Sequence, residues 1–305
     1  MHNLRILFMG TPEFAVPSLE ILVENKFNVV AVITAPDKPQ GRGQKLSPSP
    51  VKVCALQHNI PVLQPTNLKD PAFIEELKTY QATLQVVVAF RMLPQVVWSM
   101  PAFGTFNLHA SLLPQYRGAA PIHWAIINGE KETGVTTFFL KHEIDTGSII
   151  FQEREPIYEN DNAGSLYERL MKKGGQLVLQ TVKAIAAGDY PSLPQPESGE
   201  IKHAPKIFKE TCEINWSQSS ESIRNFVRGL SPYPAAWTIL NEKPFKIHIV
   251  SLVDFKKDDS NDPIITDNKN YLYIKGSDGW ISIDELQPEG KRKMSIQEFF
   301  RGNKI

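Results

Sequence analysis

The first half of the chain alternates mostly apolar, strand-like runs with amphipathic segments, and this alternation limits the possible fold more than any other feature. The apolar runs, which we interpret as strands, are Leu4–Met9, Val29–Thr34, Leu84–Phe90, Thr105–Ala110, Val135–Leu140 and Ser148–Gln152. The amphipathic segments, which we interpret as helices, are Val51–His58, Pro71–Lys78 and Ser165–Ala187. Uninterrupted apolar stretches such as Ile6–Met9 and Val86–Phe90 are typical of strands buried on both faces. The pattern predicts an α/β fold with a doubly wound, mostly parallel sheet.

The turn after the first strand carries information about cofactors. Gly10 follows the apolar run, Thr11 is a candidate helix cap, and Pro12 or Pro17 suits a first helical turn. A dinucleotide-binding fold would need the pattern G-x-G-x-x-G here, and only Gly10 is present. The turn therefore disfavours a nicotinamide or flavin dinucleotide cofactor.

The composition of the chain changes near residue 189. The stretch Asp189–Pro205 contains four prolines and little apolar periodicity, which indicates a linker. Short β-type runs follow it, at Ala235–Leu240, Phe245–Leu252, Tyr271–Ile274 and Trp280–Ile283, with a candidate hairpin turn at Gly276–Gly279. We therefore predict an α/β domain at 1–188, a linker at 189–206 and an OB-like β-barrel domain at 207–305.

Composition narrows the class of protein further. No apolar run approaches the roughly 18 residues that span a bilayer, and the first run is too short for a signal-peptide core. Cys54 and Cys212 lie far apart, so we expect them to be buried or inert, in a reducing compartment. The seven histidines show no metal-ligand spacing, so we predict no metal site. We expect a cytoplasmic protein.

The segment from Phe106 to Pro114 carries the chemistry that the residues alone suggest. Alternate side chains of a strand share a face, so Asn107 and His109 point the same way while Phe106 and Leu108 enter the core. Ligands of open α/β sheets bind at the carboxyl ends of the strands, which is where this pair lies. Strand-end histidines often have structural roles instead, so the pair is a candidate and no more.

An amide beside an imidazole suits acyl transfer to an amine. A fixed N–H donor stabilises the oxyanion that forms when the amine attacks a formyl carbon, and a histidine can move the protons. Asp145, in the turn Asp145-Thr146-Gly147, is the candidate carboxylate that would support the imidazole. Asp-Thr-Gly is also a common structural turn. No serine or cysteine stands in a nucleophile elbow, so we predict direct transfer.

The eighteen residues NLHASLLPQYRGAAPIHW, from Asn107 to Trp124, closely resemble the signature of the folate-dependent formyltransferases. The resemblance implies that Asn107, His109 and Asp145 form the catalytic trio and that 10-formyltetrahydrofolate is the formyl donor. It also implies that the folate pocket is formed by Ser111, Leu112, Leu113, Pro114, Val88, Phe90 and Arg91. The chain departs from the family pattern at Thr83, Gln85, Arg91 and Ser148.

The basic loop PDKPQGRGQKLSPSP, from Pro36 to Pro50, contains Lys38, Arg42 and Lys45 against a single acid. By composition it is either a solvated surface loop or a segment that contacts phosphates. It is nearly identical to the loop of those family members that formylate a tRNA. That resemblance implies contact with the acceptor arm, with Arg42 as the main contact.

The second domain also resembles these tRNA-formylating enzymes, at Leu230–Thr238 and Leu286–Lys291. Residues 200–305 contain sixteen Lys and Arg against fifteen Asp and Glu, so the domain is not basic overall. Its cations are clustered instead, which suffices for positional phosphate contacts. From these clusters we predict that Lys206, Lys291 and Arg292 contact the tRNA.

The resemblance implies a monomeric enzyme that transfers the formyl group of 10-formyltetrahydrofolate to the α-amino group of methionyl initiator tRNA. A related enzyme that formylates another amine, such as an amino-sugar nucleotide, is the first alternative. An RNA-binding protein without catalysis and a nicotinamide-dependent oxidoreductase are the others. The intact set of Asn107, His109 and Asp145 argues against the former, and the missing glycine pattern argues against the latter.

Overall fold

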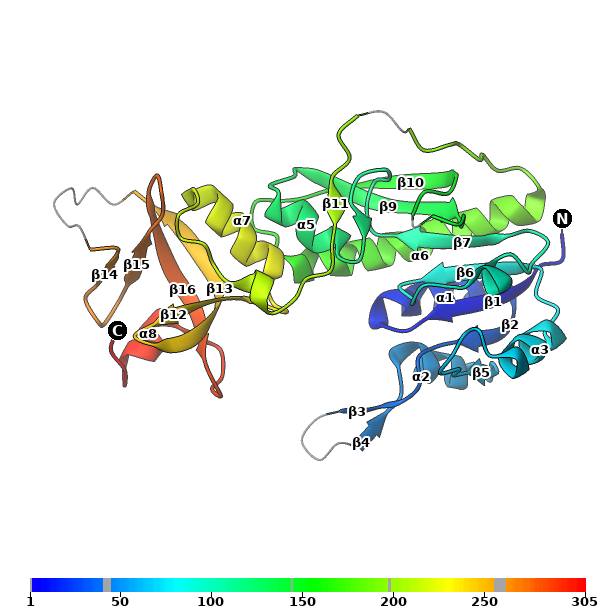
Figure 1. Cartoon of the computed structure of the whole chain (residues 1–305), viewed down its shortest axis with the longest axis horizontal. Helices are drawn as coiled ribbons and strands as arrows, with labels where there is room; N and C mark the ends of the chain where they lie inside the picture. Colours follow the sequence, from blue (N-terminus) through cyan, green and yellow to red (C-terminus); the bar gives the residue numbers. More distant parts are fainter. Residues whose placement is uncertain (1, 41–44, 144, 197–198, 255–261) are drawn as a thin grey trace. The chain divides into compact units, whose positions relative to one another are not determined.

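Figure 1 shows the computed structural model of the chain, which describes residues 2–40, 45–143, 145–196, 199–254 and 262–305. The chain divides into two compact units. The first unit is formed by Met1–Arg117, Gly134–Glu155 and Tyr167–His203, and the second by Gly118–Thr133, Pro156–Leu166 and Ala204–Ile305. Two segments that precede the proline-rich stretch in the sequence therefore pack with the C-terminal residues.

The first unit is built on a seven-stranded sheet with the order β10-β9-β7-β6-β1-β2-β5. Its strands are β1 (Arg5–Gly10), β2 (Asn28–Ile33), β5 (Val62–Leu63), β6 (Leu84–Val88), β7 (Thr105–His109), β9 (Glu132–Phe139) and β10 (Ile149–Pro156). The strands from β7 to β5 pair in parallel, whereas β9 runs antiparallel to β7. The mostly parallel sheet is confirmed.

The six predicted strands of this unit are present, but several of their ends differ. β6 ends at Val88 rather than Phe90, because Ala89 has a φ of 46° and leaves the extended region. β10 extends to Pro156, beyond the predicted Gln152. Its second half is largely exposed and polar, so it carries no apolar signal.

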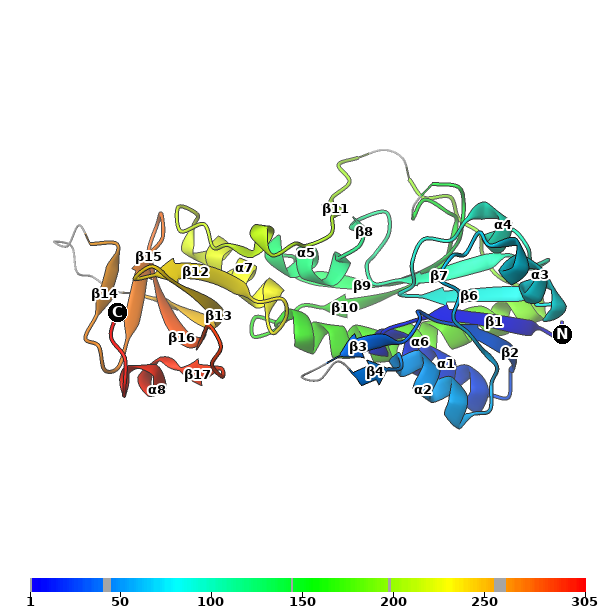
Figure 2. The ribbon, with the colours of Figure 1, turned by 60° about the horizontal axis from the view of Figure 1, so that its bottom comes forward.

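Helices cover both faces of this sheet, as the doubly wound fold requires. They are α1 (Val16–Glu24), α2 (Pro50–Gln57), α3 (Pro71–Thr79), α4 (Gln95–Trp98) and α6 (Ala163–Ala187). Figure 2 shows α3 and α4 on one side of the sheet and α1, α2 and α6 on the other. In the described residues, no helix is both long and apolar enough to cross a membrane.

The predicted start of the first helix was half right. Pro17 does lie in the first turn of α1. Thr11, however, caps nothing, because the 3₁₀ turn η1 (Glu13–Ala15) comes first and α1 begins only at Val16. The Thr11 hydroxyl instead accepts a hydrogen bond from the backbone N–H of Ala35 at 3.3 Å, which ties the end of β1 to the end of β2.

The central strands are buried on both faces. Leu7 and Met9 of β1 pack in a cluster with Phe73 of α3 and Val97 of α4. On the other face, α6 lies so close to β7 that a Cβ at Gly174 would stand 2.6 Å from Leu108. This packing fixes which side chains of β7 face away from α6.

The predicted linker is docked against the first unit rather than extended through solvent. Leu193 forms a two-way backbone bridge with Ile149, with N···O distances of 2.7 and 2.9 Å. Further along, β11 (His203–Ala204) pairs with β8 (Arg117–Gly118). A Cβ at Gly118 would stand 2.4 Å from the carbonyl oxygen of Ala204, so this pairing requires a glycine.

The second unit contains a six-stranded antiparallel sheet with the order β12-β13-β16-β15-β14, with β17 on β16. Its elements are α5 (Pro121–Ile127), η2 (Glu210–Cys212), α7 (Ser220–Leu230), β12 (Ala236–Leu240), β13 (Lys243–Val253), β14 (Ile264–Thr266), β15 (Leu272–Lys275), β16 (Trp280–Pro288), β17 (Met294–Ser295) and α8 (Ile296–Phe300). The predicted turn at Gly276–Gly279 is confirmed, because it joins β15 to β16. The predicted barrel is a curled sheet with β12 and β14 as edges.

Candidate active site

The strand β7 lies beside β6 and β9 near the centre of the sheet, and it carries Asn107 and His109. Phe106 is fully buried and Leu108 is 3% exposed, which agrees with the predicted alternation. Asn107 is half-buried and lies between Val87 of β6 and Phe138 of β9 in register. The pair therefore stands on the face opposite α6, at the carboxyl end of a parallel strand.

The imidazole of His109 is buried and held by the backbone. Its Nε2 lies 2.8 Å from the carbonyl oxygen of Tyr116. A carbonyl can only accept, so Nε2 carries the hydrogen, and in the neutral ring Nδ1 has the free lone pair. The Nδ1 atom faces Oδ2 of Asp145 at 3.9 Å, which is longer than a hydrogen bond. His109 can thus accept a proton at Nδ1 beside a carboxylate.

Asp145 reaches this position from the turn after β9. Its φ is 55°, in the left-handed region, and its side chain is only 12% exposed. Asn107, His109 and Asp145 come from β7 and from a turn about forty residues later. The structure brings His109 and Asp145 together as the sequence predicted, and the catalytic role of all three residues stays a prediction.

The segment Ser111–Pro114 is held to β9 and β10 by side-chain hydrogen bonds. The hydroxyl of Thr136 donates to the carbonyl of Ser111 at 2.6 Å and accepts from the N–H of Leu113 at 3.2 Å. Gln152 donates to the carbonyl of Leu113 at 2.9 Å. The Ser111 hydroxyl is fully buried and donates to the carbonyl of Gln115 at 2.6 Å, so it has a structural partner already. Leu112 and Pro114 are half-buried.

Three of the predicted folate-pocket residues, Val88, Phe90 and Arg91, lie at and beyond the end of β6. Val88 is fully buried in the sheet, and Phe90 packs against the cluster beneath α3 and α4. The guanidinium of Arg91 donates to the carbonyls of Thr66, at 2.9 Å, and Pro65, and it stands 5.7 Å from the centre of the Phe90 ring. Arg91 therefore ties the end of β6 to the segment after β5, and a folate contact by Arg91 stays a prediction.

The basic loop contains a short hairpin, which the sequence did not indicate. β3 (Lys38–Gln40) pairs antiparallel with β4 (Lys45–Ser47). Lys38 is exposed. Arg42 and the side chain of Lys45 lie outside the described part of the chain.

A polar network holds the root of this hairpin. Lys52 Nζ lies 2.7 Å from both Asp37 Oδ2 and Gln64 Oε1, and Gln64 Nε2 donates to Asp37 Oδ1 at 2.8 Å. The hydrogen bond from Lys52, followed by that from Gln64, holds the pKa of Asp37 below its ordinary value of 3.8. The single acid of the loop is therefore a structural anchor.

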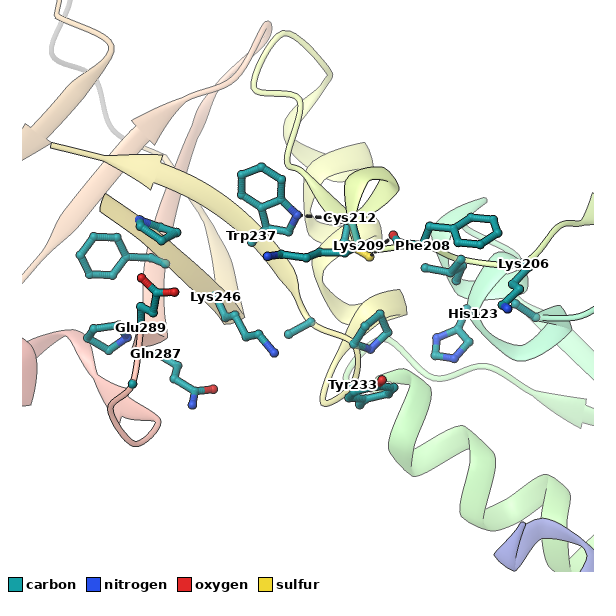
Figure 3. A pocket seen from close by; sticks show the side chains of 18 of the residues that line it. His123, Lys206, Phe208, Lys209, Cys212, Tyr233, Trp237, Lys246, Gln287 and Glu289 are labelled. Carbon is teal, nitrogen blue, oxygen red and sulfur yellow. Dashed lines mark hydrogen bonds between the residues drawn. The ribbon is translucent and has the colours of Figure 1, made fainter. Parts of the chain in front are cut away.

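The second unit contains a pocket of about 810 Å³ with cations and aromatic rings in its wall (Figure 3). The basic and aromatic side chains that line it are those of Lys206, Lys209, Lys246, Phe208, Tyr233, Trp237 and His123. Burial lowers the pKa of His123, whose Nδ1 is 2.8 Å from the carbonyl of Gly229. At neutral pH the positive charge of the pocket therefore comes from its lysines.

The predicted tRNA contacts of this unit differ in their surroundings. Lys206 is exposed, with its Nζ 5.3 Å from the centre of the Phe208 ring, and Lys291 is exposed. Arg292 pairs with Glu298 at 3.0 Å, so part of its charge is compensated. The sequence reasoning did not select Lys246, because the only other lysine of β13 is Lys243 and the two do not form a cluster of basic residues.

Cys54 lies in α2, and Cys212 lines the pocket of the second unit. Cys54 and Cys212 are free and buried, as predicted. Burial raises the pKa of the Cys54 thiol to about 11, so it stays protonated and unreactive near neutral pH. Across the described ranges, no three His, Cys, Asp or Glu side chains are grouped as metal ligands.

Two family models match the chain and together cover most of it. The model described as formyl transferase matches residues 4–182, and the model of the formyl transferase C-terminal domain matches 206–304. The chain belongs to the formyl transferase family. The family predicted from the Asn107–Trp124 segment is thus confirmed.

Comparison with individual proteins shows which members of the family the chain is similar to. The methionyl-tRNA formyltransferase of Bacteroides fragilis is 54% identical, over 99% of this chain and 95% of the relative. That of Flavobacterium johnsoniae is 50% identical, over 99% and 97%. Among solved structures, the sugar 3N-formyl transferase WlaRD, determined with dTDP and 5-N-formyl-THF, has a TM-score of 0.69 and 25% identity, covering 96% of this chain and all of its own.

Proposed function

We propose that the protein transfers the formyl group of 10-formyltetrahydrofolate to the α-amino group of methionyl initiator tRNA. The observation that carries this proposal is the identity of 50–54%, over nearly the whole chain, with methionyl-tRNA formyltransferases. The sugar formyl transferase is only 25% identical. The juxtaposition of His109 and Asp145 at the end of β7 supplies groups suited to this reaction.

His109 handles the protons of the transfer. The amine attacks the formyl carbon, a C–N bond forms, and the amine loses a proton that Nδ1 of His109 accepts. Asp145 stabilises the imidazolium that results, since its carboxylate lies 3.9 Å away. His109 then returns the proton to the folate nitrogen as the bond between that nitrogen and the formyl carbon breaks. Formylated amine and tetrahydrofolate are the products.

Asn107 stabilises the charge that develops on the formyl oxygen. The side-chain amide can donate hydrogen bonds, and β7 fixes it between two paired strands. A donor that is already in place when the charge appears costs no reorganisation during the reaction. Asn107 thus stabilises the negative charge on the formyl oxygen, and His109 moves the proton between the two nitrogens in the same reaction.

The RNA is bound by cations of both units. In the first unit these are Lys38, Arg42 and Lys45 of the basic loop, which approach the acceptor arm. In the second unit they are Lys206, Lys291 and Arg292, and the pocket that Lys206 shares with Lys209 and Lys246 supports this assignment. Residues 1–188 carry the chemistry and the basic loop, and Lys206 together with residues 207–305 supplies the other RNA contacts.

The alternative acceptor is an amino-sugar nucleotide, and one experiment separates the two. Purified protein is given 10-formyltetrahydrofolate with methionyl initiator tRNA, methionyl elongator tRNA or an amino-sugar nucleotide, and the formylated product is measured. We expect rapid formylation of the initiator tRNA alone, lost in His109→Ala. Turnover of the sugar without turnover of the tRNA would replace the proposal.

We further propose that the enzyme acts as a monomer in the cytoplasm. Sedimentation velocity of the purified chain at micromolar concentration checks the first statement, with a single species near the 34.4 kDa of the sequence expected. Cell fractionation checks the second, with the protein expected in the same fraction as ribosomes and tRNA.

A further inference from the structure

The turn that carries Asp145 is held from two sides by groups outside it. On one side, Gly147 lies so close to β9 that an added Cβ would stand 1.5 Å from the carbonyl oxygen of Phe139. On the other, Gln195 Nε2 donates to the carbonyls of Asp145 and Gly147, at 2.7 and 2.9 Å. A non-glycine residue with a φ of 55°, as at Asp145, keeps this backbone conformation only where surrounding contacts impose it.

The side chain of Gln195 is itself fixed. It is 8% exposed, and its Oε1 accepts from Nε and Nη2 of Arg117 at 3.1 and 2.6 Å. Only the amide nitrogen can donate to the two turn carbonyls, and only the amide oxygen can accept from the guanidinium. Both ends of the amide are therefore engaged, one of them with a charged donor.

These contacts close a ring around the imidazole. Nε2 of His109 binds the carbonyl of Tyr116, and Arg117 is the next residue. Arg117 holds Gln195, Gln195 holds the turn, and the turn presents the carboxylate of Asp145 to Nδ1 of His109. Every member of the ring lies in the first unit.

We propose that Gln195 is a positioning residue that holds the Asp145 carboxylate opposite Nδ1 of His109, with Arg117 orienting Gln195. This inference rests on the proposed function for its effect on catalysis. The Nδ1 and Oδ2 atoms are 3.9 Å apart, which is longer than a hydrogen bond, so the position of the carboxylate opposite the ring depends on how the turn is held. Catalytic groups have to be held within about 0.5 Å of the productive geometry by their surroundings.

Two substitutions of Gln195 and one control test the inference. Gln195→Ala removes all its contacts, whereas Gln195→Glu keeps an acceptor for Arg117 but cannot donate to the turn. Gln115→Ala is the control. Gln115 accepts from Lys202 N and donates to the carbonyl of Glu200, so it also holds the proline-rich stretch, but at a place that does not contact the Asp145 turn. Thermal unfolding and folate binding establish that each variant is folded. If Gln195→Ala does not fold, Gln195→Glu carries the test.

We expect both Gln195 variants to lose about 10- to 100-fold in kcat with little change in KM for either substrate, as misplaced catalytic groups do. Gln115→Ala is expected to stay within about twofold of the parent protein, which is the scale of a surface contact. A Gln195 variant with parental kcat would overturn the inference. An equal loss in Gln115→Ala would also overturn it, since docking of the whole stretch would then be responsible.

A double-mutant cycle separates positioning from general stabilisation. If Gln195 acts through Asp145, adding Gln195→Ala to Asp145→Ala costs no further activity, whereas independent effects multiply. A second readout needs no turnover: the NMR signals of the His109 ring should shift in both Gln195 variants in the direction seen for Asp145→Ala, and not in Gln115→Ala. Absence of that shift refutes the inference even if the acceptor proves to be another amine. No formylation of tRNA by the parent protein would refute the proposed function instead.

Discussion

Two neighbouring threonines of β9 are expected to contribute very differently to stability, although both are fully buried. Thr136 and Thr137 point to opposite faces of the sheet. The hydroxyl of Thr136 serves the Ser111 carbonyl, the Leu113 N–H and the amide of Gln152. The hydroxyl of Thr137 pairs with that of Thr181, which donates its own hydrogen to the carbonyl of Leu177. Replacement by valine keeps the shape and removes the hydroxyl.

The loss of unfolding free energy in each variant depends on which hydrogen-bonding groups lose their partner. Thr136→Val takes the hydroxyl away from a buried carbonyl and a buried N–H, and at about 1–3 kcal/mol for each of these two groups we expect a loss of about 2–6 kcal/mol. Gln152 is less affected, because it keeps the Leu113 carbonyl. Thr137→Val deprives Thr181 of an incoming bond only, so its cost stays below about 1 kcal/mol.

Urea unfolding of the two variants measures this difference. With a denaturant slope of about 2 kcal/mol per molar, Thr136→Val should lower the midpoint by about 1–3 M and Thr137→Val by less than about 0.5 M. Equal shifts, or a larger shift for Thr137→Val, would refute the argument that orphaned backbone groups dominate the cost. A combined variant equal to the sum would indicate that the two faces respond independently.

Further predictions concern catalysis, RNA binding and pH. Asn107→Ala and His109→Ala should each lower kcat by about 10²–10⁴-fold while tRNA affinity stays the same; near-normal turnover in either contradicts the assignment. Arg42→Ala should weaken tRNA binding and reduce the slope of the logarithm of the binding constant against the logarithm of the salt concentration by about 0.7–0.9. An unchanged slope would count against a contact between Arg42 and the tRNA. The lowered pKa of Asp37 means that its carboxylate stabilises the hairpin root fully above its ordinary value of 3.8 and stops doing so as the pH falls through the lower folded value. In Lys52→Met, NMR titration should return that pKa toward 3.8, and an unmoved value would show that Lys52 is not its cause.

The first unit could be predicted largely from the sequence, because its central strands are buried on both faces. Leu7 and Met9 of β1 face one helical layer, and the strand is apolar from Ile6 to Met9, so a single sequence is enough to recognise it. β10 shows the limit of this reasoning. Its second half is mostly exposed and polar, and nothing in its hydropathy separates a solvated strand from a loop.

The pairing of distant residues at the site was only partly predictable. Strand alternation placed Asn107 and His109 on one face, and that follows from local geometry. That Asp145 faces His109 depends on β9 running back antiparallel to β7, which no local pattern contains. The resemblance to a family supplied this long-range information. No local pattern indicated Lys246 either, because it lines a pocket with Lys206 and Lys209, which belong to the segment before η2 and not to β13.

The proline-rich stretch shows most clearly why composition can mislead about function. Prolines and polar residues without periodicity predict a linker, because such a segment cannot bury an apolar face. It docks here by other means, through backbone bonds at Leu193 and through the amide of Gln195. These bonds need matching carbonyls on the surface they meet, and those carbonyls belong to Ile149, Asp145 and Gly147, which the fold alone brings into place. A single glutamine in a segment without pattern gives no signal of its own. Only the position of its amide against the Asp145 turn connects the segment to the chemistry at His109.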